Sequence, residues 1–162
     1  MSRAAVAPAP ATGKRSLRIW LRLLGCSTLI EHAVRVRLRA EFGITLPQFD
    51  VLAELDAAGE AQTMSALSRR LMVSNGNVTG VIDRLARAGL VSRTVSADDR
   101  RVQFIALTPR GRRRFAAMAA AHELWIDSLL GGLGEADGER LDRLLERTKK
   151  LIRDHATRSP QR

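Results

Sequence analysis

Apolar residues recur every three or four positions along most of the chain, which indicates a mainly α-helical protein. The longest such pattern runs from Leu17 to Phe42 and predicts one amphipathic helix of 26 residues. A helix of that length spans about 39 Å, which is more than one small core covers. Its apolar stripe is therefore expected to pack against something else, such as a second copy of the chain.

A second helix is predicted to begin at Thr45, because Thr45 and Gln48 have the spacing of a capping box. Pro47 lies in the first turn, where a missing N–H costs nothing. Gly59 is the residue expected to end this helix.

Two short helical patterns follow, separated only by a tight turn at residues 72–74. Thr63 is the expected N-cap of the first and Ser74 that of the second, which Gly89 is expected to end. Two helices joined by so short a turn fit a helix-turn-helix.

After Gly89 the hydrophobic period changes from 3.6 to 2, which indicates β-strands. Residues 90–95 and 102–107 are predicted to form two strands joined by a polar tip at residues 96–101. A β-hairpin directly after a helix-turn-helix is a wing. A further helix start at Thr108 leads into two last amphipathic helices.

Composition excludes several other classes of protein. With 45% hydrophobic and 27% charged residues, the 162-residue chain is expected to form one globular domain with arms. The single cysteine, Cys26, excludes a disulfide framework and a zinc site built from several thiolates. No run reaches the roughly 18 apolar residues of a membrane span, and the start lacks the apolar block of a secretory signal. We therefore expect a cytoplasmic protein that makes no membrane contact.

Positive charge is concentrated in the second half of the chain. Lys and Arg number 27 against 17 acids, for a net charge of +10, and all but three of the cations are arginines. Residues 84–114 hold nine arginines and two acids, whereas residues 41–68 hold no Lys or Arg. A basic sector on a near-neutral body is typical of a nucleic-acid binder, although composition alone fits a solvated basic face equally well.

Four motifs in this region point to a known family. They are the helix motif Val73-Ser74-Asn75-Gly76-Asn77-Val78-Thr79-Gly80-Val81-Ile82-Asp83-Arg84-Leu85, then Gly89-Leu90-Val91, Asp99-Arg100-Arg101 and Leu107-Thr108-Pro109-Arg110-Gly111. In this order they resemble the MarR family of bacterial transcriptional regulators, a resemblance that covers about residues 17–155. It implies a homodimer with interlocked terminal helices that binds pseudo-palindromic DNA, usually as a repressor, and often releases it on binding a small aromatic acid.

The expected fold class is thus mainly α with a small β wing, a winged helix-turn-helix core flanked by N- and C-terminal dimerisation helices. The expected domains are a disordered tail at 1–14, an N-terminal dimerisation helix at 15–44, the winged helix-turn-helix DNA-binding domain at 45–111, C-terminal dimerisation helices at 112–156 and a tail at 157–162.

The second short helix is expected to read DNA. Its apolar positions turn one face inward, which leaves the opposite face for a major groove. Asn75 and Asn77 suit adenine edges, with simple capping of the first turn as the alternative, and Thr79 suits a thymine methyl or a phosphate. The expected DNA-binding residues are Ser74, Asn75, Gly76, Asn77, Thr79, Gly80, Arg84, Arg87, Asp99, Arg100 and Arg101.

Two glycines and the wing tip complete this expectation. Gly76 and Gly80 each cost a helix about 1 kcal/mol relative to alanine, which makes sense if the backbone lies close to a groove wall. Arg101, with Arg100 beside it, is expected to enter a minor groove, a solvated turn being the alternative. The resemblance implies that Asp99 orients the arginine.

A small effector is expected where the first and fifth helices meet the second. Histidines on apolar faces are more often structural, but the candidate ligand-binding residues are Trp20, His32, Phe49, His122 and Trp125. One branch of the resembled family senses peroxide through a first-helix cysteine backed by tyrosines. This chain has no tyrosine, so Cys26 is expected to be a buried small hydrophobe.

The sequence therefore predicts a sequence-specific double-stranded-DNA-binding transcriptional regulator, a homodimeric repressor released by a small ligand such as an aromatic acid. The alternatives are a winged-helix protein-interaction module and a redox-sensing regulator based on Cys26. With no Gly-rich phosphate loop, metal-ligand cluster or nucleophile elbow, we expect no enzymatic activity and no cofactor or metal.

Overall fold

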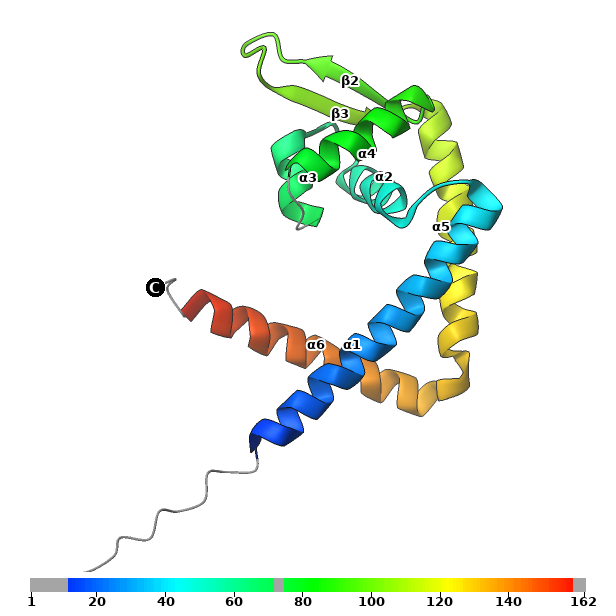
Figure 1. Cartoon of the computed structure of the whole chain (residues 1–162), viewed down its shortest axis with the longest axis vertical. Helices are drawn as coiled ribbons and strands as arrows, with labels where there is room; N and C mark the ends of the chain where they lie inside the picture. Colours follow the sequence, from blue (N-terminus) through cyan, green and yellow to red (C-terminus); the bar gives the residue numbers. More distant parts are fainter. Residues whose placement is uncertain (1–11, 72–74, 159–162) are drawn as a thin grey trace, which may run out of the picture. The chain divides into compact units, whose positions relative to one another are not determined.

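The first helix begins earlier than its apolar stripe predicts. In the computed structural model, which describes residues 12–71 and 75–158, helix α1 spans Thr12–Arg37 and continues into a π-helical segment, η1 (Leu38–Phe42) (Figure 1). Residues 12–14, expected in the tail, are therefore helical. Gly43 ends η1 with a φ of +67°, a conformation that glycine adopts without strain.

Helix α2 (Leu46–Ala58) begins with the predicted capping box. The Thr45 backbone N–H donates to Gln48 Oε1 at 2.8 Å. Gly59, with a φ of +70°, ends the helix as expected. Val51, Leu52 and Leu55 are buried and form the centre of the core.

Helices α3 (Met64–Leu71) and α4 (Asn75–Arg87) pack against each other and against α2, as expected for a helix-turn-helix. Thr63 Oγ1 accepts a hydrogen bond from the Ala66 N–H at 3.2 Å, which confirms the predicted N-cap of α3. The predicted turn at residues 72–74, including the proposed cap Ser74, lies outside the described residues.

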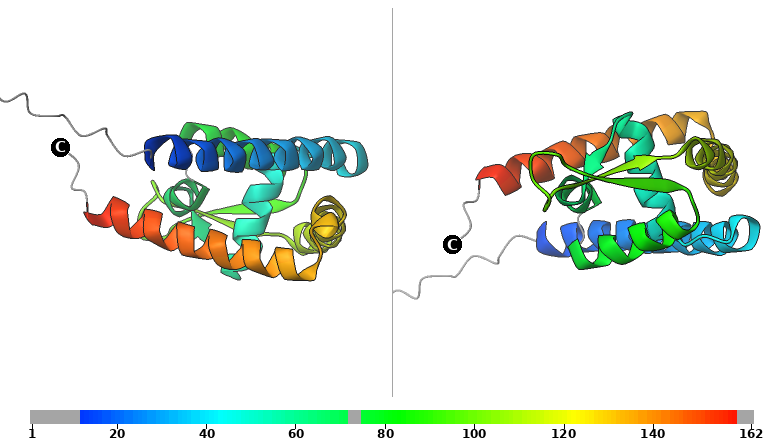
Figure 2. Two further views of the ribbon diagram at one scale, coloured as in Figure 1. Left: turned by 90° about the horizontal axis from the view of Figure 1, so that it is seen from below. Right: turned by 90° about the horizontal axis from the view of Figure 1, so that it is seen from above.

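The predicted hairpin is present as strands β2 (Val91–Val95) and β3 (Gln103–Leu107), antiparallel from the pair Val91–Leu107 to the pair Val95–Gln103. A third strand, β1 (Gln62–Thr63), pairs with the other edge of β3, so the order is β1-β3-β2. Sequence periodicity missed β1 because two residues carry no alternation. Figure 2 shows β2 and β3 from two further directions as a two-stranded ribbon.

Helix α5 (Pro109–Leu130), the 3₁₀ segment η2 (Gly131–Leu133) and helix α6 (Glu135–Arg158) complete the chain. The chain divides into two compact units within α5, one up to Ala120 and one from Ala121 onward. The first, called the winged unit below, contains the helix-turn-helix and the sheet. No helix among the described residues is long and apolar enough to cross a membrane.

Both α1 and α6 leave large apolar side chains exposed. Those on α1 range from 38% exposed for Leu23 to 73% for Leu29. On α6 the exposed residues are Leu141, Leu144, Leu145, Leu151 and Ile152. Exposed apolar side chains in such numbers mark interaction sites.

The expectation that Cys26 is buried is wrong for the single chain. Cys26 is exposed, and so are its apolar neighbours Leu23, Leu24 and Leu29 on the same helix. The helical period correctly identifies an amphipathic α1, but it does not show which surface covers the apolar face.

Candidate nucleic-acid interface

Helix α4 is held in place by one face and exposes the other. Val78, Ile82 and Leu85 are at most 1% exposed and anchor the helix in the core of the winged unit. The opposite side carries the predicted contact residues Gly76, Asn77, Thr79, Gly80, Arg84 and Arg87, all exposed. Asn75 is the first residue of α4. The core thus leaves the opposite face of the helix open to a partner.

Gly76 and Gly80 are not required by the packing of the winged unit. A Cβ added to either residue would have no heavy atom within 4 Å, and neither has a positive φ. Nothing within the described chain therefore explains two glycines on one exposed helical face. A partner that comes close to the helix backbone would explain them, because only hydrogen then lies between that backbone and the partner.

Asp83 on α4 forms an ion pair with Arg93 on β2. The sequence places Asp83 on the outward face of the helix together with the glycines. In the structure it is half-buried and connects the helix to the wing, so Arg93 serves this contact instead of adding a free cation to the basic sector. Helical spacing could not reveal the pair, because Arg93 lies in a strand whose register depends on the hairpin.

The tip of the wing is an ordered turn that carries two exposed arginines, Arg100 and Arg101. Asp99 Oδ1 accepts a hydrogen bond from the Arg101 backbone N–H at 2.9 Å, and the Val102 N–H donates to the Asp99 carbonyl at 2.9 Å. Ser96 Oγ accepts the backbone N–H groups of residues 98 and 99. The carboxylate of Asp99 thus acts on the backbone of Arg101, in line with the orienting role that the resemblance implies.

The base of the wing explains the Leu-Thr-Pro-Arg-Gly motif. Thr108 Oγ1 donates to the Gly89 carbonyl at 2.7 Å and accepts the Gly111 N–H at 2.9 Å. A Cβ on Gly111 would lie 1.9 Å from the Leu90 carbonyl oxygen, so only glycine fits there. The motif therefore fixes the wing and the start of α5 against the end of α4, and its threonine and glycine are structural.

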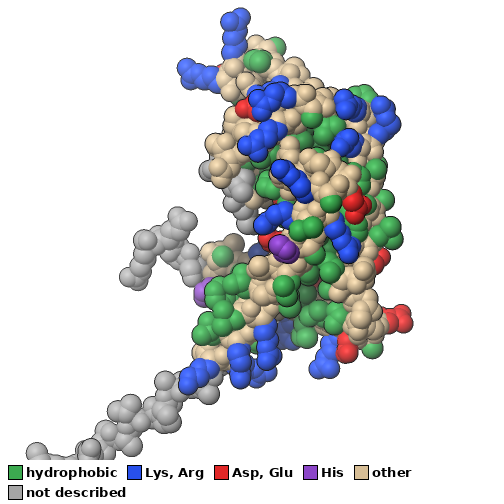
Figure 3. All heavy atoms as spheres, turned by 45° about the vertical axis from the view of Figure 1, so that its right-hand side comes forward, with side chains coloured by type: hydrophobic (Ala, Val, Ile, Leu, Met, Phe, Trp, Pro, Cys, Tyr) green, Lys and Arg blue, Asp and Glu red, His purple; other side chains and the backbone are tan. Residues whose placement is uncertain are grey.

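Besides the two arginines of the wing tip, the winged unit carries further arginines at the start of α5. A space-filling view shows Lys and Arg side chains over its upper part (Figure 3). Arg112 and Arg113 are exposed, whereas Arg114 donates from Nη2 to the Phe42 carbonyl at 2.7 Å. The sequence alone does not distinguish Arg114 from its neighbours, because its partner Phe42 lies 72 positions away in the chain.

The expected effector residues lie in different surroundings. Trp20 and His32 are exposed on α1, while Phe49 is buried and its ring lies 5.6 Å from that of Phe115. In the second unit the rings of His122 and Trp125 are 6.4 Å apart.

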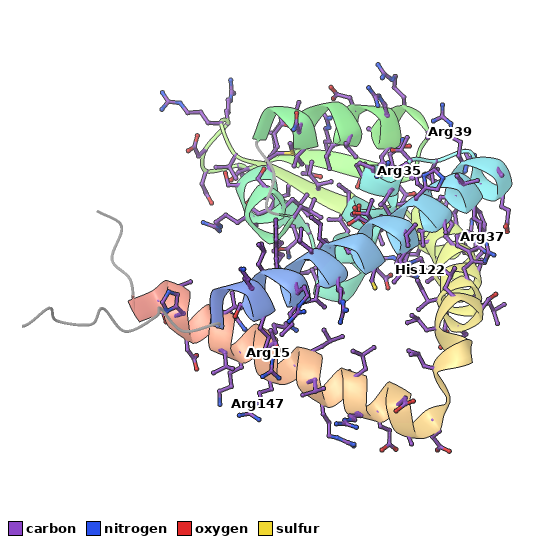
Figure 4. The ribbon with its side chains drawn as sticks, turned by 60° about the horizontal axis from the view of Figure 1, so that its bottom comes forward. Arg15, Arg35, Arg37, Arg39, His122 and Arg147 are labelled. Carbon is purple, nitrogen blue, oxygen red and sulfur yellow. The ribbon has the colours of Figure 1, made fainter. Side chains whose placement is uncertain are left out.

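His32 does line a hollow of about 570 Å³ in the winged unit, a contact that the other four candidates do not share. Arg35 and Arg39 border the same hollow, and Figure 4 shows them along the end of α1 and on η1. Its apolar wall comes from Val36, Ile44, Leu46 and Pro47.

Asp50 lies on α2, which packs against α4. Burial, together with the neighbouring carboxylates of Glu31 and Glu54, raises the pKa of Asp50 to about 6. Asp50 and Asn77 line a common hollow of about 350 Å³ between α2 and α4. The described residues contain no group of His, Cys, Asp or Glu side chains that could hold a metal ion.

These features define a winged helix-turn-helix. Comparison with known proteins shows the family to which the chain belongs. A sequence model of the MarR family matches residues 44–102. The uncharacterized HTH-type transcriptional regulator YkoM of Bacillus subtilis is 32% identical over 117 residues, which cover 72% of this chain and 74% of YkoM. The chain belongs to the MarR family and is a transcriptional regulator of that family, not an enzyme.

Two further similarities bear on function. The transcriptional activatory protein BadR of Rhodopseudomonas palustris is 35% identical over 104 residues, which cover 63% of this chain and 59% of BadR. The crystal structure of BpsR from Bordetella bronchiseptica, whose DNA binding is regulated by 6-hydroxynicotinic acid, is 25% identical with a TM-score of 0.72. The match covers 82% of this chain and 98% of BpsR.

Proposed function

We propose that the protein binds pseudo-palindromic double-stranded DNA as a homodimer and represses transcription. The observation that carries this proposal is the outward face of α4, with two glycines that the fold does not need, next to a wing tip that presents Arg100 and Arg101. A helix whose exposed face carries glycines can lie close to the walls of a major groove. Arginines on a narrow turn can enter a minor groove, whose negative potential attracts them.

The exposed apolar side chains of α1 and α6 support the proposed homodimer. Side chains such as Trp20, 56% exposed, are too numerous on these two helices for a monomer in water. Two copies related by a two-fold axis would bury them and place two α4 helices in successive major grooves, about 34 Å apart. The two-fold symmetry of such a dimer calls for a pseudo-palindromic operator.

Release by a small aromatic acid is the second part of the proposal. The hollow at His32 offers cationic side chains at Arg35 and Arg39 next to an apolar wall, which suits a planar ring with one carboxylate. The regulation of BpsR by 6-hydroxynicotinic acid supports this class of ligand. Such a ligand releases DNA only if it binds the DNA-incompetent arrangement more tightly than the competent one.

Fluorescence anisotropy with the DNA upstream of the protein's own gene tests the contacts. Arg101→Ala is expected to weaken binding more than tenfold at fixed salt while helicity and the dimer persist. Arg113→Ala, which removes one exposed charge from α5, is the matched control and is expected to change affinity less than threefold. Equal losses in the two variants would remove the wing from the mechanism.

Base reading and regulatory sign need separate measurements. Asn77→Ala is expected to lower the ratio of the affinity for operator to the affinity for random duplex, whereas an unchanged ratio would assign Asn77 to a phosphate.

A promoter-reporter assay is expected to show higher expression when the gene is deleted. Lower expression would instead indicate an activator, the role that BadR's name records.

A further inference from the structure

Three arginines from two helices of the winged unit line one hollow of about 370 Å³. Arg87 lies in the last turn of α4, and Arg110 and Arg114 lie one turn apart at the start of α5. Residues 42–44 and Gln48 also line it. This hollow shares Ile44 with the hollow at His32 but none of that hollow's other lining residues, and no residue of the wing tip lines it.

None of the three guanidinium groups is neutralised within the described chain. The ion pairs among described residues involve other cations, and no carboxylate oxygen lies within 4.0 Å of Arg87, Arg110 or Arg114. The lining contains no Asp or Glu. Three positive charges around one hollow repel each other, and a bound anion would relieve that repulsion.

The polar side chains of the hollow offer almost only donors. Arg114 uses one N–H of five for the Phe42 carbonyl and keeps the others. Gln48 Oε1 already accepts from the Thr45 N–H and hydroxyl, which leaves its NH₂ group as the free side-chain donor. A ligand for such a site must be rich in acceptors and negatively charged, and arginine forks match the paired oxygens of phosphate.

We propose that this hollow binds a compact anion with at least two negative charges, such as a short polyphosphate or the phosphate tail of a nucleotide. Phosphate oxygens of the DNA backbone have the same chemistry, so the experiment below distinguishes a free ligand from DNA.

Anion binding in this hollow would act on α4, the helix proposed to contact DNA. Residues 43–45, in which Gly43 has a φ of +67°, connect η1 to α2. Arg110 and Arg114 lie in the first two turns of α5, directly after the wing. An anion held by Arg87 and these two arginines would fix the end of α4 against both connections. This regulatory consequence depends on the proposed function, whereas the binding itself does not.

The test is calorimetric titration of the full chain with tripolyphosphate in the absence of DNA, at constant ionic strength. We expect one ligand per chain, and at least tenfold weaker binding of orthophosphate. Arg110→Ala is expected to weaken tripolyphosphate binding at least tenfold. The Arg110 side chain makes no hydrogen bond or ion pair among the described residues, so this variant is expected to fold, and circular dichroism checks that it does.

Arg112→Ala and Arg113→Ala are the matched controls. Each removes one charge from the same turn of α5 without lining the hollow, and each is expected to retain binding within threefold. Equal weakening in these controls and in Arg110→Ala would overturn the proposal, because it would show diffuse attraction to a basic protein. Absence of saturable binding, or orthophosphate binding as tight as tripolyphosphate, would also overturn it.

Operator titrations of the same variants identify the source of the anion. A free ligand predicts that Arg110→Ala binds duplex within threefold of wild type, whereas occupation by DNA predicts loss of duplex and tripolyphosphate binding together. Failure of the wild-type protein to bind any duplex would refute the proposed function and leave the anion site standing.

Discussion

Replacement of Gly80 by alanine is expected to stabilise the protein and weaken its DNA binding. Gly80 lies in the interior of α4, and an added Cβ meets no heavy atom within 4 Å. Alanine favours a helix over glycine by about 1 kcal/mol. For a chain of this length that corresponds to a rise of about 2–4 °C in the melting temperature.

The effect on DNA binding has the opposite sign. If the backbone of α4 lies against the groove wall, the new methyl group occupies space that the duplex needs. We expect at least a tenfold loss of operator affinity, which corresponds to about 1.4 kcal/mol. A gain in stability together with a loss of affinity would exclude misfolding as the cause of the loss.

The assay combines thermal unfolding followed by circular dichroism with anisotropy titrations on one operator duplex. Gly138→Ala in α6 is the matched control, because Gly138 is also helical with no heavy atom within 4 Å of an added Cβ. It is expected to raise the melting temperature and leave affinity unchanged, with sedimentation checking the dimer. Unchanged affinity in Gly80→Ala would refute the close approach of α4 to DNA.

Three further predictions concern the scaffold. Gly111→Ala is expected to destabilise the chain by roughly 3 kcal/mol in urea unfolding, because its Cβ would overlap the Leu90 carbonyl; an unchanged midpoint would show that α5 moves away freely. In a double-mutant cycle, Asp83→Asn and Arg93→Gln are expected to couple by roughly 0.5–1 kcal/mol, and strict additivity would contradict the ion pair. Burial, with the nearby carboxylates, raises the pKa of Asp50 from 3.8 to about 6. Between these two pH values the native chain keeps a proton on Asp50 that the unfolded chain releases, so the free energy of unfolding falls as the pH rises. Asp50→Asn is therefore expected to add about 1 kcal/mol at pH 7.5, after allowance for solvent screening, and little at pH 4; an equal gain at both pH values would contradict the shifted pKa.

The local features of the fold were predictable because short-range rules govern them. The capping box at Thr45, the cap at Thr63 and the glycine ends of α2 and α4 depend only on neighbouring residues. The buried face of α4 follows from helical period, and that period also predicts which residues of α4 are exposed. Most of the candidate DNA-contact set could therefore be proposed from the sequence.

Features that join distant segments were not predictable in the same way. The pair Asp83–Arg93 and the bond from Arg114 to Phe42 require the strand register and the helix packing to be known. The hollow around Arg87 forms where the end of α4, the start of α5 and residues 42–44 come together, and these segments are far apart in the sequence. The exposure of Cys26 has a different origin, because an amphipathic pattern shows that a face needs cover without showing which molecule provides it.

The most direct test of DNA binding is anisotropy of the upstream duplex and a scrambled duplex across a salt series. If Arg84, Arg100 and Arg101 of both subunits neutralise about six phosphates, log K is expected to fall with log salt with a slope of about −5. The upstream duplex is expected to bind at least a hundredfold more tightly than the scrambled one at every salt concentration. A shallow slope with no preference between the duplexes would contradict the account and favour a winged helix that binds protein.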